Sequence, residues 1–179
     1  MSGAMKVGRP IIVTGMYESG VSDVSKYLKD LGIYKTDNSV INDLNLEILD
    51  SLNSYWDQLD IPKIAQLNEY QAPGETLFQI SRLIEKIEED NISFILSDPI
   101  FCLTVHSWLS FLKNPIFITC IRNPLDTAKA LKARYGFSIY KGLSLWESYY
   151  WALNRSICRD DSIIVFYENG ASEQEEYGE

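Results

Sequence analysis

Residues 11–28 read IIVTGMYESGVSDVSKYL, and this stretch points to the fold of the whole chain. It begins with a continuous β-branched run, which is typical of a strand buried on both faces of a parallel sheet. After Gly20, the apolar residues Val21, Val24 and Leu28 recur at helical spacing. A strand, a short glycine loop and a helix are therefore predicted. Backbone amides in such a loop bind phosphate or sulfate oxygens, although glycine turns of this kind are equally common without a ligand.

The remaining chain alternates predicted strands with predicted helices. Strands are expected at 92–97, 114–121 and 162–167, and helices at 42–56, 73–91, 101–112, 123–136 and 143–157. This alternation favours an α/β fold in which three layers, helix, sheet and helix, surround a central, mostly parallel sheet. We expect one domain over residues 1–179, with a leader at 1–9 and an acidic tail at 168–179.

The composition narrows the class of protein. A net charge of −9 argues against a basic surface for nucleic acid, and no apolar run is long enough to span a membrane. Three cysteines without a CxxC pair and a single histidine, His106, argue against a metal site. We therefore expect a cytoplasmic protein with buried free thiols and no metal. The sequence leaves the oligomeric state open.

Two polar residues follow predicted strands and mark the edge where ligands bind in parallel sheets. Asp98, in the segment SDPI, follows the strand at 92–97, and its alternative role is to cap the next helix. Arg122 follows the strand at 114–121 and precedes a helix, where a guanidinium can make a fork of hydrogen bonds to phosphate. Its alternative role is a surface ion pair with a carboxylate such as Asp126.

These segments together resemble the sulfotransferase family that uses 3′-phosphoadenosine 5′-phosphosulfate, and in particular its bacterial, cytoplasmic-type members. The loop GMYESGVS at 15–22 is similar to the family pattern GMxRSGTS. The long block that begins at Arg122, RNPLDTAKALKARYGFSIYKGLSLWESYY, is similar to RNPLxxAxSLxxRxGFSxxxGLxLWxxY. Four such segments occur in the family's order between about Ile11 and Glu168, which covers nearly the whole chain.

The resemblance implies a fold like that of the P-loop NTPases and assigns roles to individual residues. The loop would hold the 5′-phosphosulfate, and Arg122 and the position of Ala130 would face the 3′-phosphate. The residues implied in binding 3′-phosphoadenosine 5′-phosphosulfate or adenosine 3′,5′-bisphosphate are Gly15, Met16, Tyr17, Glu18, Ser19, Gly20, Val21, Ser22, Arg122 and Ala130. The acceptor would be a hydroxyl group of a small molecule or a glycan. Asp98 and His106 are the candidate catalytic bases, and the alternative for His106 is a packed position in an apolar helix.

The chain departs from the family pattern at several polar positions. Members carry Lys or Arg where this chain has Glu18, and Thr at Val21. The Lys and Arg of their KDPR segment are Ser97 and Ile100 here, and a serine is Ala130. Sulfuryl transfer builds charge on the leaving phosphate, which a cation stabilises. Two unit charges about 4 Å apart, at an effective dielectric constant of about 20, interact with an energy of roughly 4 kcal/mol. A Glu18 carboxylate that points into the loop would therefore repel the bound anion and oppose both its binding and the transfer of the sulfuryl group.

Three functions follow from these residues. The first is sulfuryl transfer, with an activity impaired by the departures. The second is a non-catalytic protein that binds adenosine bisphosphate or a protein partner through the inherited fold. The third is a P-loop kinase for nucleotides or small molecules, which Val21 at the usual lysine position argues against.

Overall fold

The central sheet is parallel, as the alternation of strands and helices predicts. The computed structural model describes residues 8–58, 70–89, 92–157 and 162–168. Its five strands are β1 (Pro10–Gly15), β2 (Tyr34–Lys35), β3 (Phe94–Ser97), β4 (Ile116–Arg122) and β5 (Ser162–Tyr167). They lie in the order β2-β3-β1-β4-β5, and all four neighbouring pairs run parallel. β1 therefore lies at the centre of the sheet, with β3 and β4 on either side of it.

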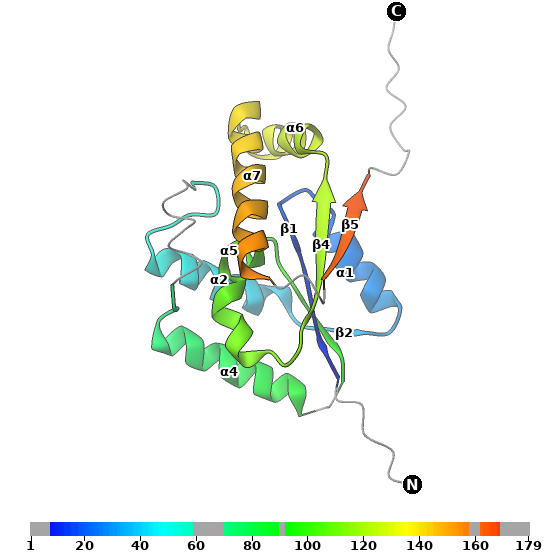
Figure 1. The fold of residues 1–179 in the computed structure, drawn as a ribbon, viewed down its shortest axis with the longest axis vertical. Coiled ribbons are helices and arrows are strands. Elements are labelled where there is room, and N and C mark those ends of the chain that lie inside the picture. Colours follow the sequence, from blue (N-terminus) through cyan, green and yellow to red (C-terminus); the bar gives the residue numbers. More distant parts are fainter. Residues whose placement is uncertain (1–7, 59–69, 90–91, 158–161, 169–179) are drawn as a thin grey trace, which may run out of the picture.

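Helices cover both faces of this sheet (Figure 1). They are α1 (Val21–Asp30), α2 (Asn38–Ser51), α4 (Gly74–Glu88), α5 (Phe101–Trp108, continued by a 3₁₀ turn at Leu109–Phe111), α6 (Pro124–Tyr135) and α7 (Ile139–Ser156). One cluster of buried side chains joins Val13 and Cys120 of the sheet to Val24 and Leu28 of α1. A larger cluster on the opposite face unites α2, α4, α5 and α7 over residues such as Ile12. The three-layer α/β/α arrangement is thus confirmed.

Alternation along β1 explains why its stretch reads as continuously apolar. Ile12 faces the larger cluster and Val13 the smaller one, and both side chains are fully buried. A strand with water on one face would need a polar residue at every second position. The two-sided burial of β1 is therefore the physical reason for the uninterrupted run.

The chain's own capping signals place α6. The Asn123 side chain accepts hydrogen bonds from the amides of Leu125 (2.9 Å) and Asp126 (3.4 Å), and Pro124 is the first helical residue. Gly136 ends the helix in the left-handed conformation, with φ of 73°. These signals confirm the predicted helix at 123–136.

The outer edge of the sheet is apolar. β5 pairs with β4 on one side, and Ile163, Ile164 and Phe166 are 53%, 57% and 76% exposed. Within the part of the chain that the structure describes, no helix is both long and apolar enough to cross a membrane. The predicted leader up to residue 7, the tail beyond residue 168 and Cys158 lie outside the described residues.

Candidate functional site

The β1–α1 loop is a tight turn that leads into a helix without a side-chain cap. Gly20 precedes α1 in the left-handed conformation, and no side chain caps the first turn of this helix. The Ser19 amide donates to the Met16 carbonyl at 3.1 Å, which closes a tight turn around Tyr17 and Glu18. Glu18 is itself left-handed, with φ of 66°. The amides at the start of α1 are thereby left uncapped at the carboxyl edge of the central strand.

The strand order brings Arg122 to this loop. Gly15 pairs with Cys120 in the register between β1 and β4, and Arg122 ends β4 two residues further on. Its Nη1 donates a hydrogen bond to the Glu18 carbonyl oxygen at 3.1 Å. The alternative partner, Asp126, lies 3.9 Å from the Lys129 ammonium instead. Arg122 is therefore directed at the loop.

Glu18 has a second arginine partner that sequence analysis missed. Arg134, in the last turn of α6, donates from Nη1 to Glu18 Oε1 at 2.6 Å, and this hydrogen bond raises the pKa of the guanidinium. The Glu18 side chain is 23% exposed and that of Arg134 is 64% exposed. The carboxylate thus lies at the rim of the loop, engaged with a cation rather than free.

A hollow of about 410 Å³ lies between the loop and these arginines. Its lining residues are Met16, Tyr17, Glu18, Gly20, Val21, Ser22, Asp23, Pro99, Arg122, Arg134 and Tyr167. Seven of them belong to the predicted binding set. Of the other predicted residues, Gly15 and the buried Ser19 lie in the same loop without lining the hollow, and Ala130 lies on α6, also outside the lining.

Tyr167 closes the hollow on the side of β5. A Cβ atom on Gly20 would overlap the Tyr167 ring, so the ring lies directly against the glycine. The Tyr167 hydroxyl donates to Asp23 Oδ2 at 2.6 Å, and this hydrogen bond raises the pKa of the phenol. Asp23 is in the first turn of α1, so the site contains two carboxylates, Glu18 and Asp23, as well as two arginines.

Tyr17 turns inward from the loop. Its ring lies 4.5 Å from that of Trp56 and 6.3 Å from that of Tyr149, measured between centroids. Burial raises the pKa of its phenol. The Trp56 ring continues the contact to Tyr135 at 5.2 Å, so an aromatic wall joins the loop to the end of α6.

The buried Asp98 carboxylate accepts two hydrogen bonds from within the protein. Its Oδ1 accepts the Ile100 amide at 2.6 Å, and its Oδ2 accepts the Asn42 side-chain amide at 3.0 Å. Burial raises the pKa of this carboxyl, and the two hydrogen bonds oppose part of that shift. Pro99, and not Asp98, lines the hollow. The predicted Asp-Pro turn is therefore present, but no side chain caps α5, so the predicted capping of the next helix by Asp98 is wrong.

His106 lies away from the loop hollow. It is in the last turn of α5, its side chain is exposed, and it does not line the hollow. The alternative of a packed histidine is wrong, because position 106 is the one outward-facing position of an otherwise buried helix. The structure brings neither candidate base into the hollow.

The two departures after β3 belong to the fold's interior. Ser97 Oγ donates to Asn38 Oδ1 at 3.1 Å, and the Ile100 side chain is fully buried in the larger cluster. Cations at these positions would have to leave that packing. Among the described residues that line the hollow, Arg122 and Arg134 are the basic ones.

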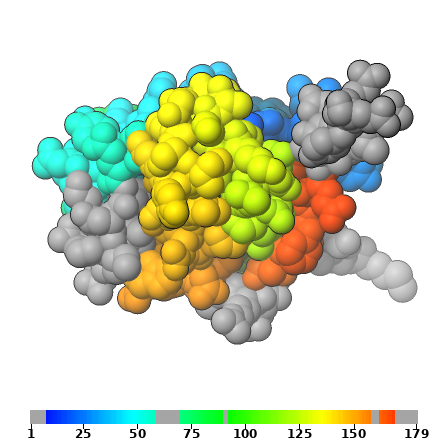
Figure 2. Space-filling view, turned by 90° about the horizontal axis from the view of Figure 1, so that it is seen from above, coloured from blue at the N-terminus to red at the C-terminus, as the bar shows by residue number. Residues whose placement is uncertain are grey.

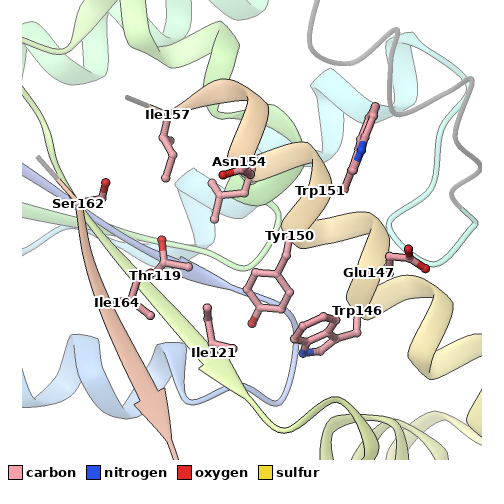
Figure 3. A pocket seen from close by; sticks show the side chains of 11 residues that line it. Thr119, Ile121, Trp146, Glu147, Tyr150, Trp151, Asn154, Ile157, Ser162 and Ile164 are labelled. Atoms are coloured by element: carbon pink, nitrogen blue, oxygen red, sulfur yellow. The ribbon is translucent and has the colours of Figure 1, made fainter. Parts of the chain in front are cut away.

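A second, larger groove of about 700 Å³ lies between α7 and strands β4 and β5. Figure 3 shows Tyr150 projecting from α7 toward Ile121, with Thr119 and Ile164 on the strands opposite. Its lining is mostly apolar and aromatic, and it lies along the strands rather than at their carboxyl ends. We therefore place the site at the smaller loop hollow, where charged groups converge.

Tyr150 connects the two regions. Its hydroxyl donates to the Cys120 carbonyl at 2.6 Å and accepts the Met16 amide at 3.2 Å. Trp146, one turn earlier on α7, donates from Nε1 to the Arg122 carbonyl at 3.0 Å. Two aromatic residues of α7 thus fix the backbone on both sides of the hollow.

The comparisons with known proteins establish the fold alone. No protein-family model and no curated protein sequence matches the chain. The structure is similar to that of TT1252 from Thermus thermophilus, with a TM-score of 0.50 and 17% identity over 93% of this chain and 91% of the other. An uncharacterized protein from Eubacterium ventriosum has a TM-score of 0.46 and 14% identity, over 88% and 89% of the two chains. The chain therefore shares its architecture with TT1252, whose description names no activity.

Proposed function

We propose that this chain is a sulfotransferase-type protein that binds 3′-phosphoadenosine 5′-phosphosulfate, or adenosine 3′,5′-bisphosphate, in the loop hollow. The observation that carries the proposal is that the β1–α1 loop and Arg122 of the adjacent β4 line the same hollow. A loop of uncapped amides and an arginine side chain are the groups that recognise phosphate oxygens. The sequence resemblance selects the bisphosphate nucleotide from among phosphate-bearing ligands.

Each element has a distinct role in this proposal. The amides at the start of α1 hold the 5′ oxyanion, and Arg122 holds the other phosphate. Tyr150 and Trp146 keep the loop and the Arg122 backbone in place through the hydrogen bonds to Met16, Cys120 and Arg122. The bound nucleotide supplies an activated sulfuryl group for a hydroxyl of a small molecule or glycan.

A second candidate is a non-catalytic protein that binds the nucleotide. This candidate is favoured by the hydrogen bonds that the carboxylates of Glu18 and Asp98 already make within the protein. Glu18 is paired with Arg134, and Asp98 is buried with both oxygens accepting hydrogen bonds. In this arrangement neither carboxylate is available to take a proton from an acceptor hydroxyl. Binding without turnover is the outcome expected of this candidate.

Thermal denaturation with each nucleotide tests the binding proposal. We expect millimolar adenosine 3′,5′-bisphosphate to raise the Tm by several degrees and Arg122→Met to abolish the shift. Lys129→Met is the matched control, because this exposed cation on α6 does not line the hollow, and its shift should equal that of the wild type. The binding proposal is wrong if neither nucleotide stabilises the protein. A shift with ATP and Mg²⁺ alone would indicate a kinase instead.

Turnover separates the two candidates. The protein is incubated with the sulfated nucleotide and a panel of phenolic, alcoholic and glycan hydroxyl acceptors, and release of the bisphosphate is followed over time. Acceptor-dependent release that Arg122→Met abolishes supports the transferase. Nucleotide binding with no release above the buffer rate supports the non-catalytic protein.

A further inference from the structure

Two arginines from different elements converge on Glu18. Arg122 at the end of β4 binds its carbonyl oxygen at 3.1 Å, and Arg134 in the last turn of α6 binds its carboxylate at 2.6 Å. The three residues line one hollow. In Figure 2, which looks down on this edge of the molecule, α6 lies beside β5. Glu18 thus engages both arginines, Arg122 through its backbone carbonyl oxygen and Arg134 through its carboxylate.

We propose that Arg134 is the second phosphate-binding arginine of the hollow, and that the Glu18 carboxylate is the internal counter-ion that a phosphate must displace from it. This assignment rests on the proposed function for the identity of the ligand. It gives a role to a residue to which the sequence analysis assigned none, and it explains how a carboxylate fits into an anion-binding loop. While the ligand is absent, the Glu18 carboxylate binds Arg134 in the place of a phosphate oxygen.

The chemistry of the pair permits this exchange. A carboxylate and a phosphate offer an arginine the same geometry, two oxygens facing two parallel N–H groups. One of the five N–H donors of Arg134 binds Glu18, and the guanidinium carbon lies over the Tyr135 ring, 5.4 Å from its centroid. Because Arg134 is largely exposed, replacing one anion by another costs little desolvation. Arg134 can therefore change partner without rearrangement of α6.

The charges make the exchange obligatory. A phosphate in the hollow would lie close to Glu18, and two anions sharing one site repel each other. The ligand therefore binds only when the carboxylate turns away from Arg134 toward solvent. Glu18 does not need to move its backbone for this, since the Arg122 hydrogen bond is to its carbonyl oxygen. Glu18 then lowers the affinity for every phosphate ligand.

Calorimetric titration of four proteins tests the assignment: wild type, Glu18→Gln, Glu18→Gln with Arg134→Met, and Glu18→Gln with Lys132→Met. The probes are inorganic pyrophosphate and adenosine 3′,5′-bisphosphate. Glu18→Gln keeps the shape of the side chain and removes its charge. Lys132 is in the same last turn of α6, is exposed and does not line the hollow, so its loss controls for net charge.

We expect Glu18→Gln to bind both probes about tenfold more tightly than the wild type, since a surface ion pair and one like charge are removed together. Adding Arg134→Met should return the affinity to the wild-type level or below, whereas adding Lys132→Met should retain at least half of the gain. Unfolding curves without ligand should be similar for the four proteins, which excludes a folding defect.

The two proposals fail in different ways. If the bisphosphate binds all four proteins equally, the assignment of Arg134 and Glu18 is overturned and the proposed function stands. If pyrophosphate follows the expected order and the nucleotide binds to none of the proteins, the assignment stands and the nucleotide proposal is overturned. If neither probe binds to any protein, both are overturned.

Discussion

The ring of Tyr167, the last residue of β5, lies directly against the backbone of Gly20, where a Cβ atom would overlap it. The glycine has φ of 90°, and the Tyr167 hydroxyl reaches past it to Asp23 at 2.6 Å. Two features therefore favour glycine at position 20: the left-handed backbone conformation and the Tyr167 ring that lies against it. The contact also connects β5, at the edge of the sheet, to the loop that begins at the central strand.

Gly20→Ala should destabilise the protein more than Gly32→Ala does. Both glycines have φ of 90°, but a Cβ on Gly32 would meet no heavy atom within 4 Å. The left-handed backbone costs each variant about 1 kcal/mol. Gly20→Ala additionally has to move the Tyr167 ring, and we expect a total of about 2–3 kcal/mol by urea denaturation. Equal losses for the two variants would show that the ring is not held against Gly20.

Tyr150→Phe should loosen the loop from β4. The substitution keeps the ring and removes the hydroxyl that bridges the Met16 amide and the Cys120 carbonyl. We expect a loss of about 1–3 kcal/mol in the free energy of unfolding, because two backbone groups lose a partner. The Met16 amide should also exchange faster with solvent. Tyr140→Phe, at a side chain that is 87% exposed, is the control and should change neither quantity.

Asp98 should make stability depend on pH in the opposite direction from most carboxyls. Burial raises its pKa in the folded protein, so the folded state keeps the proton to a higher pH than the unfolded state. Stability from this residue is therefore present below the unfolded pKa and is lost as pH rises through the folded pKa. Asp98→Asn, in which the Asn42 amide can turn its oxygen toward the new amide, should lack this loss. The variant's stability relative to wild type should rise as the pH increases through the range in which wild-type Asp98 loses its proton.

Asp37 is the matched carboxyl for this measurement. Its pKa is lowered by hydrogen bonds from the Ser39 amide and hydroxyl, so its contribution to stability is present at higher pH and is lost as pH falls. The difference between Asp37→Asn and wild type should change with the opposite sign. If Asp98→Asn gave the same sign as Asp37→Asn, the burial of Asp98 would be disproved.

The two described thiols should be inert in the folded protein. Burial raises the pKa of both Cys102 and Cys120 to about 12, which leaves roughly one thiolate in ten thousand at pH 8. In a Cys158→Ser variant, an aromatic disulfide reagent should react with neither thiol within an hour, and with both after unfolding in guanidinium. Rapid reaction of one thiol per native chain would contradict the packing of the sheet around Cys120 or of α5 around Cys102.

Most helices and strands can be predicted from the sequence because the residues that begin, end and stabilise them lie close together in the chain. The apolar run at 162–167 matches β5 to the residue, and Pro124 and Gly136 bound α6 as expected. The predicted start of α7 at Leu143 is wrong by four residues, because Gly142 resembles a helix breaker. The structure shows another reason for this glycine: a Cβ there would stand 2.7 Å from the Ala128 Cα atom. β2 has two residues and no pattern of its own, since it exists through pairing with β3.

The sequence predicts the loop and Arg122 as parts of the candidate site, but it does not predict which way the Glu18 side chain points. A strand, a glycine loop and a helix are visible in eighteen consecutive residues. The partner of Glu18 is 116 positions away, and basic residues in the last turn of a helix, such as Lys132 and Arg134, are expected for the helix dipole alone. The family pattern that the chain resembles has an arginine at position 134 and no fixed residue at 132, but it does not show what Arg134 contacts. The fold shows this, because α6 brings Arg134 to Glu18.

The central position of β1 also constrains when the sheet can form. Pro10 pairs with Phe94, and Ile11 pairs with Ile116, so β1 has neither of its neighbouring strands until the chain has been synthesised as far as residue 94. Pairings between such distant segments form slowly, because long loops must close before any contact stabilises them. We therefore expect refolding on the scale of milliseconds to seconds.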